Sequence, residues 1–314
     1  MITTVTLNPA LDLTLGVKEF KEDDSNRVQW SIKNPGGKGI NVSRIVNLLG
    51  GLVNTIAFIG GHTGAQLREL LKTEGVILWE VESEKETRIN VTFVVDKTRT
   101  QTRLNQTGAP ITPKELKSLF GLIGQVGDNA DFLVISGSLP PNVSKDTYFK
   151  IVSLVKAKSD RVRIVLDADG ETLAKGIRGG PYLIKPNVHE LERLVGKKVS
   201  SEKDICRAAL IVQKMGARNV VVSRGEKGVI ALDEHGEFFS VAGPKVKVAS
   251  TVGAGDALVA GLVYKLDQGC SFAEALPHGV AVGSAMVMTP GTELCRLADV
   301  KKILHKVKVN TLKI

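Results

Sequence analysis

The sequence predicts an α/β fold in which a doubly wound, mostly parallel sheet carries helices on both faces, together with a small antiparallel sheet. Two observations predict the large sheet: short apolar runs alternate with segments of helical periodicity, and polar residues follow most of these runs. A third observation predicts the small sheet, because two stretches alternate apolar and polar residues with a period of two.

The predicted strands of the large sheet are apolar runs that suit burial on both faces. They lie at Thr55–Ile59, Phe132–Ile135, Arg163–Leu166, Tyr182–Ile184 and Asn219–Val222. The helices predicted between them are Ala65–Glu74, Pro113–Val126, Lys145–Lys156, Val188–Val195 and Lys203–Met215. Ligands of such sheets collect at the carboxyl ends of the strands. Polar candidates at those ends are Ser136-Gly137-Ser138, Asp167, Lys185-Pro186-Asn187 and Ser223-Arg224-Gly225.

The small sheet is predicted from the period of two in Leu11–Phe20 with Arg27–Ile32, and in Arg88–Val95 with Thr100–Leu104. We expect these segments to pair into one antiparallel sheet. The domains expected are therefore a core of residues 1–10, 34–86 and 107–314, and a small sheet of residues 11–33 and 87–106. An exposed sheet with one apolar face tends to pair with another sheet, so a homodimer is expected.

Composition indicates a cytoplasmic enzyme of one large domain, with 314 residues and 43% hydrophobic content. No apolar run reaches membrane-spanning length, and Met1–Val5 lacks the basic start of a signal peptide. The scattered Cys206, Cys270 and Cys295 suit reduced, structural roles. The net charge of +9 is spread out, partly over the tail Lys301–Lys313, and aromatic residues are only 4%. Anionic small substrates therefore suit this charge better than nucleic acid.

The segment Ser250–Ala257 reads STVGAGDA and leads into the apolar helical run Ala257–Val263. Backbone N–H groups and the helix dipole at such an N-terminus suit a transferring phosphoryl group, which Gly253, Ala254 and Gly255 would hold in an anion hole. Asp256 beside this hole can accept the proton of an attacking hydroxyl. The alternative is a glycine-cornered turn in which Asp256 is only the helix N-cap.

A second glycine cluster, Pro35–Arg44 with the sequence PGGKGINVSR, opens another predicted helix that stops at Gly50-Gly51. It is not a Walker A loop, because Gly-Ile follows Lys38 where that loop needs Ser or Thr. Gly37 and Gly39 would let a polyhydroxylated ligand lie against the backbone, while Asn41 pairs with hydroxyls and Lys38 supplies a cation. A structural turn explains the glycines alone, but neither the lysine nor the asparagine.

The two glycine motifs resemble the two signatures of the ribokinase-like carbohydrate kinases. Further motifs resemble the phosphofructokinase B branch, which phosphorylates sugar phosphates: Thr6–Asp12 (TLNPALD), Thr87–Asn90 (TRIN), Ser136–Pro140 (SGSLP) and Lys185–Asn187 (KPN). The resemblance extends from Thr3 to about Leu304. It implies a ribokinase-like fold, ATP as phosphoryl donor, and a small sheet that forms a lid over the sugar and joins two chains into a homodimer.

The resemblance also implies roles on the sugar side of the site. Asp256 is the expected catalytic base, Asp12 and Asn41 bind sugar hydroxyls, and Arg88 binds the substrate phosphate. Each has a structural alternative: Asp12 can be a turn residue, and Arg88 a solvated arginine at a strand edge. Further candidates for the same phosphate, each with a purely structural alternative, are Lys38, Arg27, Arg103 and Ser138.

On the nucleotide side, the resemblance implies binding by Lys185, Asn187, Ser223, Gly225, Gly228 and Gly283. Asn187–Glu190 resembles an Asn-x-x-Glu element that helps to place Mg²⁺, which accepts sparse, partly water-mediated coordination. The alternative for Glu190 is a first-turn carboxylate on a helix dipole. The segment Ala281–Glu293 is expected to lie behind the adenine. A monovalent cation, K⁺, is expected on the backbone carbonyls of Ser250, Val252 and Gly291.

The motifs disagree about which sugar phosphate is used. Gly37-Lys38-Gly39 and Asn26-Arg27-Val28 resemble 1-phosphofructokinases and tagatose-6-phosphate kinases, whereas Gly291–Cys295 and Thr102-Arg103-Leu104 resemble 6-phosphofructokinases. We favour fructose 6-phosphate over those two alternatives, and a non-catalytic sugar-phosphate regulator would not need Asp256. A nicotinamide oxidoreductase would need Gly-x-Gly-x-x-Gly where Asn8-Pro9 stands. A nucleoside or ribose kinase should lack Arg88 and Lys38.

Overall fold

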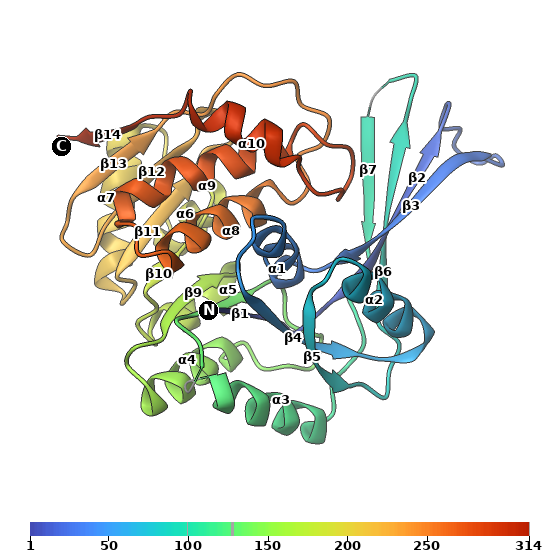
Figure 1. Cartoon of the computed structure of the whole chain (residues 1–314), viewed down its shortest axis with the longest axis horizontal. Helices are drawn as coiled ribbons and strands as arrows, with labels where there is room; N and C mark the ends of the chain where they lie inside the picture. The colour runs from blue at the N-terminus through green and yellow to red at the C-terminus, as the bar shows by residue number, and fades with distance from the viewer. Residues whose placement is uncertain (99, 127–128, 314) are drawn as a thin grey trace.

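The computed structural model describes residues 1–98, 100–126 and 129–313. Among these residues, ten strands form one sheet in the order β14-β13-β12-β11-β10-β9-β8-β1-β4-β5, and four strands form a second sheet in the order β3-β2-β6-β7. Helices pack on the large sheet, and the small sheet projects from it (Figure 1). The predicted α/β class with a separate small sheet is therefore confirmed.

The large sheet is parallel from β5 to β11 and antiparallel beyond β11. The chain begins in β1, moves out to β4 and β5 on one side, and then returns to β8 on the other side. The order of strands thus reverses at β1, where α/β sheets open a crevice at their carboxyl ends. The strands are β1 (Ile2–Thr6), β4 (Val53–Ile59), β5 (Ile77–Glu82), β8 (Phe132–Ser136), β9 (Arg163–Asp167), β10 (Leu183–Ile184), β11 (Asn219–Ser223), β12 (Val229–Leu232), β13 (Phe238–Val241) and β14 (Val309–Leu312).

Side chains of the buried strands alternate between two helical layers, as the period of two requires. In β8, Leu133 and Ile135 join one apolar core, and Phe132 and Val134 join the other. The first core includes α3 (Pro113–Val126), α4 (Thr147–Lys158), α5 (Gly170–Ile177), α6 (Val188–Val195) and α7 (Glu202–Lys214). The second includes α1 (Lys38–Leu48), α8 (Ala254–Asp267), α9 (Phe272–Met286) and α10 (Leu297–Leu304), while α2 (Gly61–Thr73) packs on a smaller cluster with Ile40.

The helices α3 and α6 have the predicted bounds, and the other predicted helices differ only at their ends. The largest difference is α2, which begins at Gly61 and not at Ala65, because its first turn holds glycine, histidine and threonine and so has no apolar pattern. The basic tail Lys301–Lys313 contains both the end of α10 and the strand β14.

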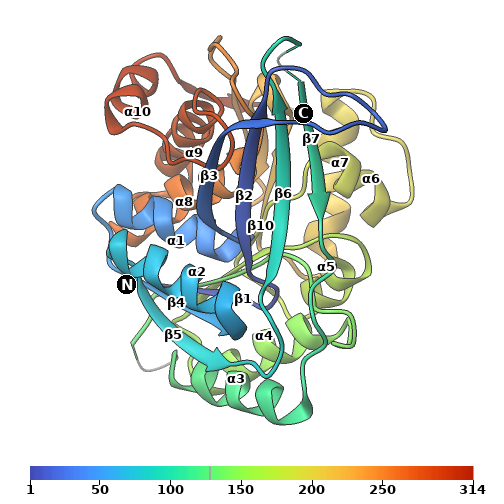
Figure 2. The same ribbon diagram turned by 90° about the vertical axis from the view of Figure 1, so that its right-hand side faces the viewer.

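The lid, as we call the small sheet, consists of β2 (Ala10–Val17), β3 (Val28–Gly36), β6 (Arg88–Val95) and β7 (Thr100–Asn105), which lie side by side in Figure 2. The pairs β2–β3 and β6–β7 are antiparallel, but the central pair β2–β6 is parallel. The prediction of an entirely antiparallel lid is therefore wrong for its centre. The reason is that β2 and β6 follow the parallel strands β1 and β5 and so leave the core in the same direction. In addition, β3 continues to Gly36, beyond the expected boundary at residue 33.

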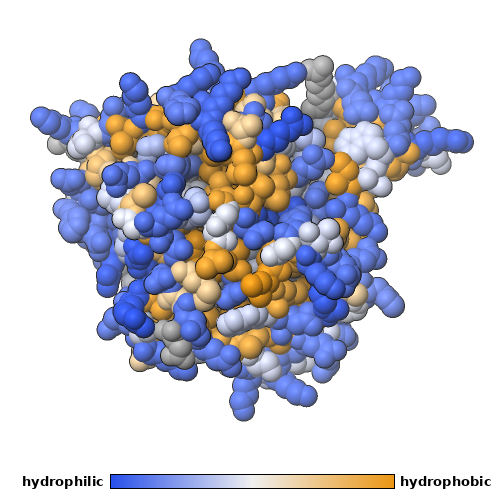
Figure 3. All heavy atoms as spheres, viewed as in Figure 1, coloured by the Kyte–Doolittle hydropathy of each residue, from blue (hydrophilic) through white to orange (hydrophobic). Residues whose placement is uncertain are grey.

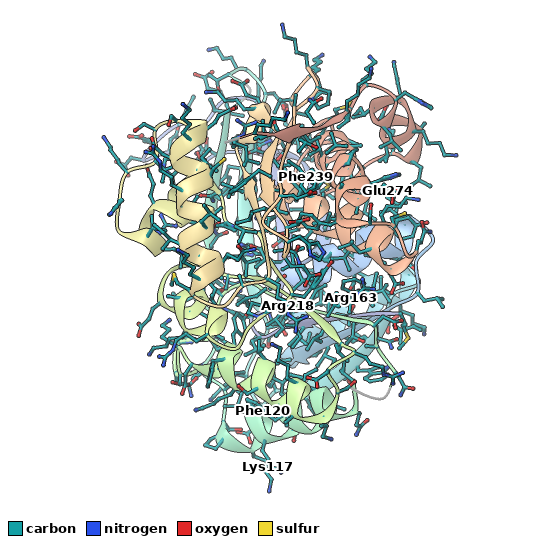
Figure 4. The ribbon with its side chains drawn as sticks, turned by 90° about the vertical axis from the view of Figure 1, so that its left-hand side faces the viewer. Lys117, Phe120, Arg163, Arg218, Phe239 and Glu274 are labelled. Carbon is teal, nitrogen blue, oxygen red and sulfur yellow. The ribbon has the colours of Figure 1, made fainter. Side chains whose placement is uncertain are left out.

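At the amino ends of β8 and β9, away from the lid, the side chain of Arg163 stacks on that of Phe132. The Arg163 guanidinium lies 3.9 Å from the ring centroid of Phe132 and donates to the Leu266 carbonyl at 3.4 Å. Figure 4 labels Arg163 on this side of the molecule. Hydrophilic side chains cover the tip of the lid (Figure 3), where Lys18–Ser25 are exposed. Over the ranges that the structure describes, no helix is long and apolar enough to cross a membrane.

Candidate active site

The N-terminus of α8 lies at the carboxyl edge of the large sheet. Gly253 is its N-cap with φ 74°, a left-handed conformation that favours glycine, and no side chain caps the helix there. Asp256 is therefore not the N-cap, since it lies inside the first turn. Its carboxylate is buried, with 6% exposure, and accepts a hydrogen bond of 2.8 Å from Asn41 Nδ2. The structure thus joins the two glycine motifs directly.

The pKa of Asp256 is raised from 3.8 to about 6, mainly because burial penalises its charged form. The Lys38 ammonium opposes this rise, the nearby Asp167 carboxylate adds to it, and the hydrogen bond from Asn41 opposes it. A carboxylate of this pKa is ionised at neutral pH and still basic enough to take a proton from a hydroxyl in a transition state.

Two lysines flank the buried carboxylate of Asp167, at the end of β9. Lys38 Nζ lies 3.3 Å and Lys185 Nζ 3.5 Å from Asp167 Oδ1. Burial alone would raise the pKa of Asp167, but the two ammonium groups hold it below its ordinary value. The same pairing raises the pKa of Lys38. Lys185 also lies against the start of α8, because a Cβ on Gly255 would stand 3.4 Å from its Nζ. The cations therefore face the proposed anion hole.

The glycines of the PGGKG motif have packing reasons that the sequence did not reveal. A Cβ on Gly39 would stand 2.4 Å from Thr6 Oγ1 and 2.9 Å from the Val5 carbonyl, so α1 approaches β1 closely only with glycine there. A Cβ on Gly37, which has φ 115°, would stand 2.8 Å from a methyl group of Thr6. Gly36 leaves its space to the Asp12 carboxylate, 2.4 Å from its ideal Cβ position.

Polar side chains form a row across the lid. Asp12 is opposite Asn34 on one side and Asn90 on the other, and residues in direct register point to the same face. Asn90 Nδ2 donates to Asp12 Oδ1 at 2.9 Å. Burial raises the pKa of Asp12. The hydrogen bond from Asn90 and the positive charges of Arg44, Arg88 and Arg103 oppose this rise. Arg103 lies on the same face of the lid as Asp12, because it is in register with Thr92 and through it with Thr14.

Arg88 binds backbone carbonyls at the base of the lid. Its Nη2 donates to Asn8 at 2.8 Å, its Nη1 to Gln106 at 2.6 Å, and its Nε to Pro9 at 3.3 Å. Burial lowers its pKa, against the pull of Asp12. The residue predicted to bind a phosphate thus also joins the start of β2 to the segment after β7, and it is not a solvated strand-edge arginine.

Ser138 and Arg27 are placed differently. Ser138 follows β8, and its Oγ accepts from Asn8 Nδ2 at 3.2 Å, beside the base of the lid. Arg27 is exposed just before β3, where Val28 pairs with Val17 at the far end of the lid. At about 3.3 Å per residue, the strand carries it roughly 20 Å away from Asn34. Within this chain, Arg27 is not brought to the other predicted residues.

Asn187 and Glu190 form a capping box at the start of α6. Asn187 Oδ1 accepts from the Glu190 N–H at 2.9 Å, and Glu190 Oε2 accepts from the Asn187 N–H at 2.8 Å. The Oε2 oxygen of Glu190 therefore has the structural role that was the alternative for this residue, at the first turn of a helix. Glu190 is nevertheless close enough to Lys38 to help raise the pKa of that lysine.

The remaining nucleotide-side residues lie along β11 and the segments after it. Ser223 bridges to Asn187, and its N–H donates to the Pro186 carbonyl at 3.0 Å. Gly225 has open space where a Cβ would stand, which suits contact with a ligand. Gly228 and Gly283 are instead close to other backbone atoms. A Cβ on Gly228 would stand 2.0 Å from the Val241 carbonyl, and a Cβ on Gly283 would stand 3.1 Å from the Ala254 carbonyl.

The predicted cation residues lie in two segments. The N–H groups of Ala249 and Ser250 both donate to the Val287 carbonyl, at 2.7 and 3.2 Å, and Val252 N donates to Ser250 Oγ at 3.2 Å. Gly291, with φ 58°, packs against the lid, where its Cβ would stand 3.0 Å from Thr14 Oγ1.

Sequence reasoning noted Asp167 at a strand end and Asn90 in the TRIN motif but assigned neither a role, and it passed over Asn34. The position of Asp167 after a buried strand was the available signal. Nothing in the sequence places Asn34 beside Asp12, because that contact depends on the register between β2 and β3.

Comparison with known proteins agrees with this site. Residues 6–299 match the pfkB family carbohydrate kinases. The chain is 33% identical over 309 residues to the 1-phosphofructokinase of Borreliella burgdorferi, covering 98% of each chain. It is 36% identical over 304 residues to the ATP-dependent 6-phosphofructokinase isozyme 2 of Escherichia coli, covering 96% of this chain and 97% of that protein.

Among solved structures, the phosphofructokinase-2 of Escherichia coli in complex with substrates and products superposes with a TM-score of 0.92 at 35% identity. The alignment covers 97% of this chain and 98% of that one. The chain therefore belongs to the pfkB family of carbohydrate kinases, and it is an ATP-dependent sugar kinase.

Proposed function

We propose that this kinase phosphorylates a ketohexose phosphate, and that the acceptor is fructose 6-phosphate, which becomes fructose 1,6-bisphosphate. The observation that carries the proposal is the hydrogen bond from Asn41 to Asp256, because it joins an amide able to bind a hydroxyl to a buried carboxylate of raised pKa in the first turn of α8. Relatives named 1-phosphofructokinase, 6-phosphofructokinase and D-tagatose-1-phosphate kinase support the ketohexose phosphate class.

The sugar side offers buried polar atoms without partners. Among the residues that the structure describes, Asn41 Oδ1 and Asn90 Oδ1 lack a donor, and Asn34 Nδ2 lacks an acceptor. Leaving such groups unpaired costs about 1–3 kcal/mol each, and a ligand that carries several hydroxyls can both donate and accept here. These three amides surround Asp12 or Asp256, so they support an acceptor rich in hydroxyls.

Cationic side chains on the same face of the lid support a phosphorylated acceptor. Arg103 and Arg88 both act on the charge of Asp12. Arg88 uses only part of its fork of donors on backbone carbonyls, and a guanidinium has five N–H groups. We assign the acceptor phosphate to these two arginines.

In the proposed step, the primary hydroxyl oxygen of the sugar attacks the γ-phosphorus of ATP, and the bond from that phosphorus to the bridging oxygen of ADP breaks. The hydroxyl proton goes to Asp256. The N–H groups of Gly253, Ala254 and Gly255, together with Lys185 and Lys38, hold the charge on the transferring phosphoryl group. ATP would extend from this point toward Ser223 and Gly225.

The residues present fit Mg²⁺ as a further cofactor. Among the described residues, none forms a hydrogen bond with the buried Asp167 Oδ2, and the Glu190 carboxylate lies near Lys38. Both would hold the ion or its water ligands, and Mg²⁺ when bound would neutralise charge on the ATP phosphates. We retain K⁺ as a proposal for the carbonyls of Ser250 and Val252, which share one loop tied to Val287, and of Gly291; the Escherichia coli phosphofructokinase-2 has been solved in complex with potassium.

We also propose a homodimer joined through the outer face of the lid. The residues of β2, β6 and β7 that point away from Asp12 include Leu13, Leu15, Phe93 and Leu104, and Leu104 is 57% exposed. An apolar sheet face of this kind is stabilised by covering it with a second copy.

Fructose 1-phosphate remains the second candidate, because four relatives carry the name 1-phosphofructokinase. Lys38, the residue that most resembles those enzymes, points to Asp167 and not to the lid, so it does not favour fructose 1-phosphate. Arg103, in the segment Thr102-Arg103-Leu104 that resembles 6-phosphofructokinases, shares the face of the lid that carries Asp12, and this supports fructose 6-phosphate. Comparing kcat/KM for fructose 6-phosphate, fructose 1-phosphate and tagatose 6-phosphate tests this choice. A higher value for either of the last two would overturn it.

A further inference from the structure

One glutamine of the lid contacts the loop that leads into α8. Gln101 lies on β7, in register with Val94 and through it with Gly16, so its side chain shares the face of the lid that carries Asp12. Its Nε2 donates to the Ala249 carbonyl at 3.0 Å, and its Oε1 accepts from Ser250 Oγ at 3.1 Å. Both ends of one carboxamide are therefore used on two consecutive residues of a distant segment.

The loop that Gln101 contacts is the one that sets up the anion hole. Ser250 is buried, at 3% exposure, and its Oγ also accepts from the Val252 N–H at 3.2 Å. That turn leads directly to the left-handed N-cap Gly253 and so to the first N–H groups of α8. The Gln101 contact is thus separated from the expected position of the transferring phosphoryl group by one short turn.

A second contact joins the lid to the segment that holds the same loop. The backbone of Gly291 packs on Thr14, which is 3% exposed, and Gly291 follows the segment whose Val287 carbonyl holds Ala249 and Ser250. The base of the lid is fixed separately by Arg88. Gln101 therefore holds a part of the lid that the base does not.

We propose that Gln101 is a positioning residue that makes the order of the anion-hole loop depend on a closed lid. The inference rests on the proposed kinase function. With the lid shut over the sugar, the carboxamide holds Ala249 and Ser250, and the loop presents its N–H groups to the γ-phosphate. When the lid opens, the loop loses both contacts. Phosphoryl transfer is thereby favoured when the acceptor is enclosed and water is excluded.

The test compares Gln101→Ala with Gln29→Ala, which removes an exposed carboxamide from β3 at the edge of the lid. We expect Gln101→Ala to lower kcat about tenfold, with KM for ATP unchanged and KM for fructose 6-phosphate changed by less than threefold. We also expect it to raise the amount of ATP hydrolysed per sugar phosphorylated. Gln29→Ala should leave all of these values near those of the wild type.

A second measurement is independent of the activity. Hydrogen exchange of the Ala249, Ser250 and Val252 amides, with no ligand added, should be at least tenfold faster in Gln101→Ala than in the wild type or in Gln29→Ala. Equal exchange in all three proteins would overturn the role of Gln101, whatever the substrate. Faster exchange in a protein that phosphorylates none of the tested sugars would support the contact and reject the proposed substrate class. A loss of kcat of similar size in both variants would show that the mutations act through the stability of the lid.

Discussion

Asp256→Asn should separate the cost of this carboxylate to stability from its benefit to catalysis. The raised pKa means that the folded protein disfavours the ionised form. A rise from 3.8 to about 6 corresponds to about 3 kcal/mol, at about 1.4 kcal/mol for each pKa unit. Asparagine keeps the shape and can still accept from Asn41, but it carries no charge. We therefore expect the variant to be more stable than the wild type at pH 8 by up to about 3 kcal/mol.

The sign of the pH dependence follows from the direction of the shift. Because the pKa of Asp256 is higher in the folded than in the unfolded protein, the folded form binds more protons between pH 3.8 and about 6. The stability that this group contributes therefore falls as the pH rises through that window, and the full penalty applies above it. The difference between variant and wild type should be smaller at pH 5 than at pH 8.

Urea denaturation at pH 5, 6, 7 and 8 measures the stability difference, and Asp169→Asn, which alters an exposed ion pair with Arg193, is the matched control. Turnover of Asp256→Asn should fall by ~10²–10⁴-fold, because the attacking hydroxyl has lost its base. Turnover within a few-fold of the wild type would remove Asp256 from the base role. A variant that is less stable at pH 8, or a difference that does not change with pH, would refute the argument from burial.

Three further results are expected. Arg88→Ala should raise KM for fructose 6-phosphate by a factor equivalent to ~2–4 kcal/mol, while KM for ATP changes little. If activity on free fructose falls by the same factor, Arg88 acts only through the carbonyls of Asn8, Pro9 and Gln106. Asp167→Asn should lower the free energy of unfolding by ~3 kcal/mol in urea denaturation, since Lys185 would remain buried without its counter-charge. A decrease below ~1 kcal/mol, which is the decrease expected for Asp169→Asn, would contradict this. Leu15→Glu should sediment as a monomer at micromolar concentration. Leu52→Glu, at a 75% exposed position outside the lid, should leave the oligomeric state unchanged. A Leu15→Glu protein that is still dimeric would reject the lid as the interface.

Local patterns in the sequence are enough to predict the class of the fold and to single out the two glycine motifs. Buried strands and amphipathic helices follow from local periodicity, so α3 and α6 were predicted with their observed bounds. The small residues before Asp256 marked a helix N-terminus, and the structure places a left-handed glycine N-cap there. The Asn-x-x-Glu spacing likewise marked the start of α6, since a capping box is a local arrangement.

The contacts between residues that are distant in the sequence depend on the tertiary structure. The parallel pairing of β2 with β6 sets Asn90 beside Asp12, and the register of β2 with β3 adds Asn34. Close packing of three strand and helix ends brings Lys38 and Lys185 to Asp167. The contact of Gln101 with Ala249 and Ser250 depends on how the lid leans over the core. These contacts escape sequence patterns because register and packing between segments far apart in the chain are fixed by the sum of many side-chain contacts, and no local period records that sum.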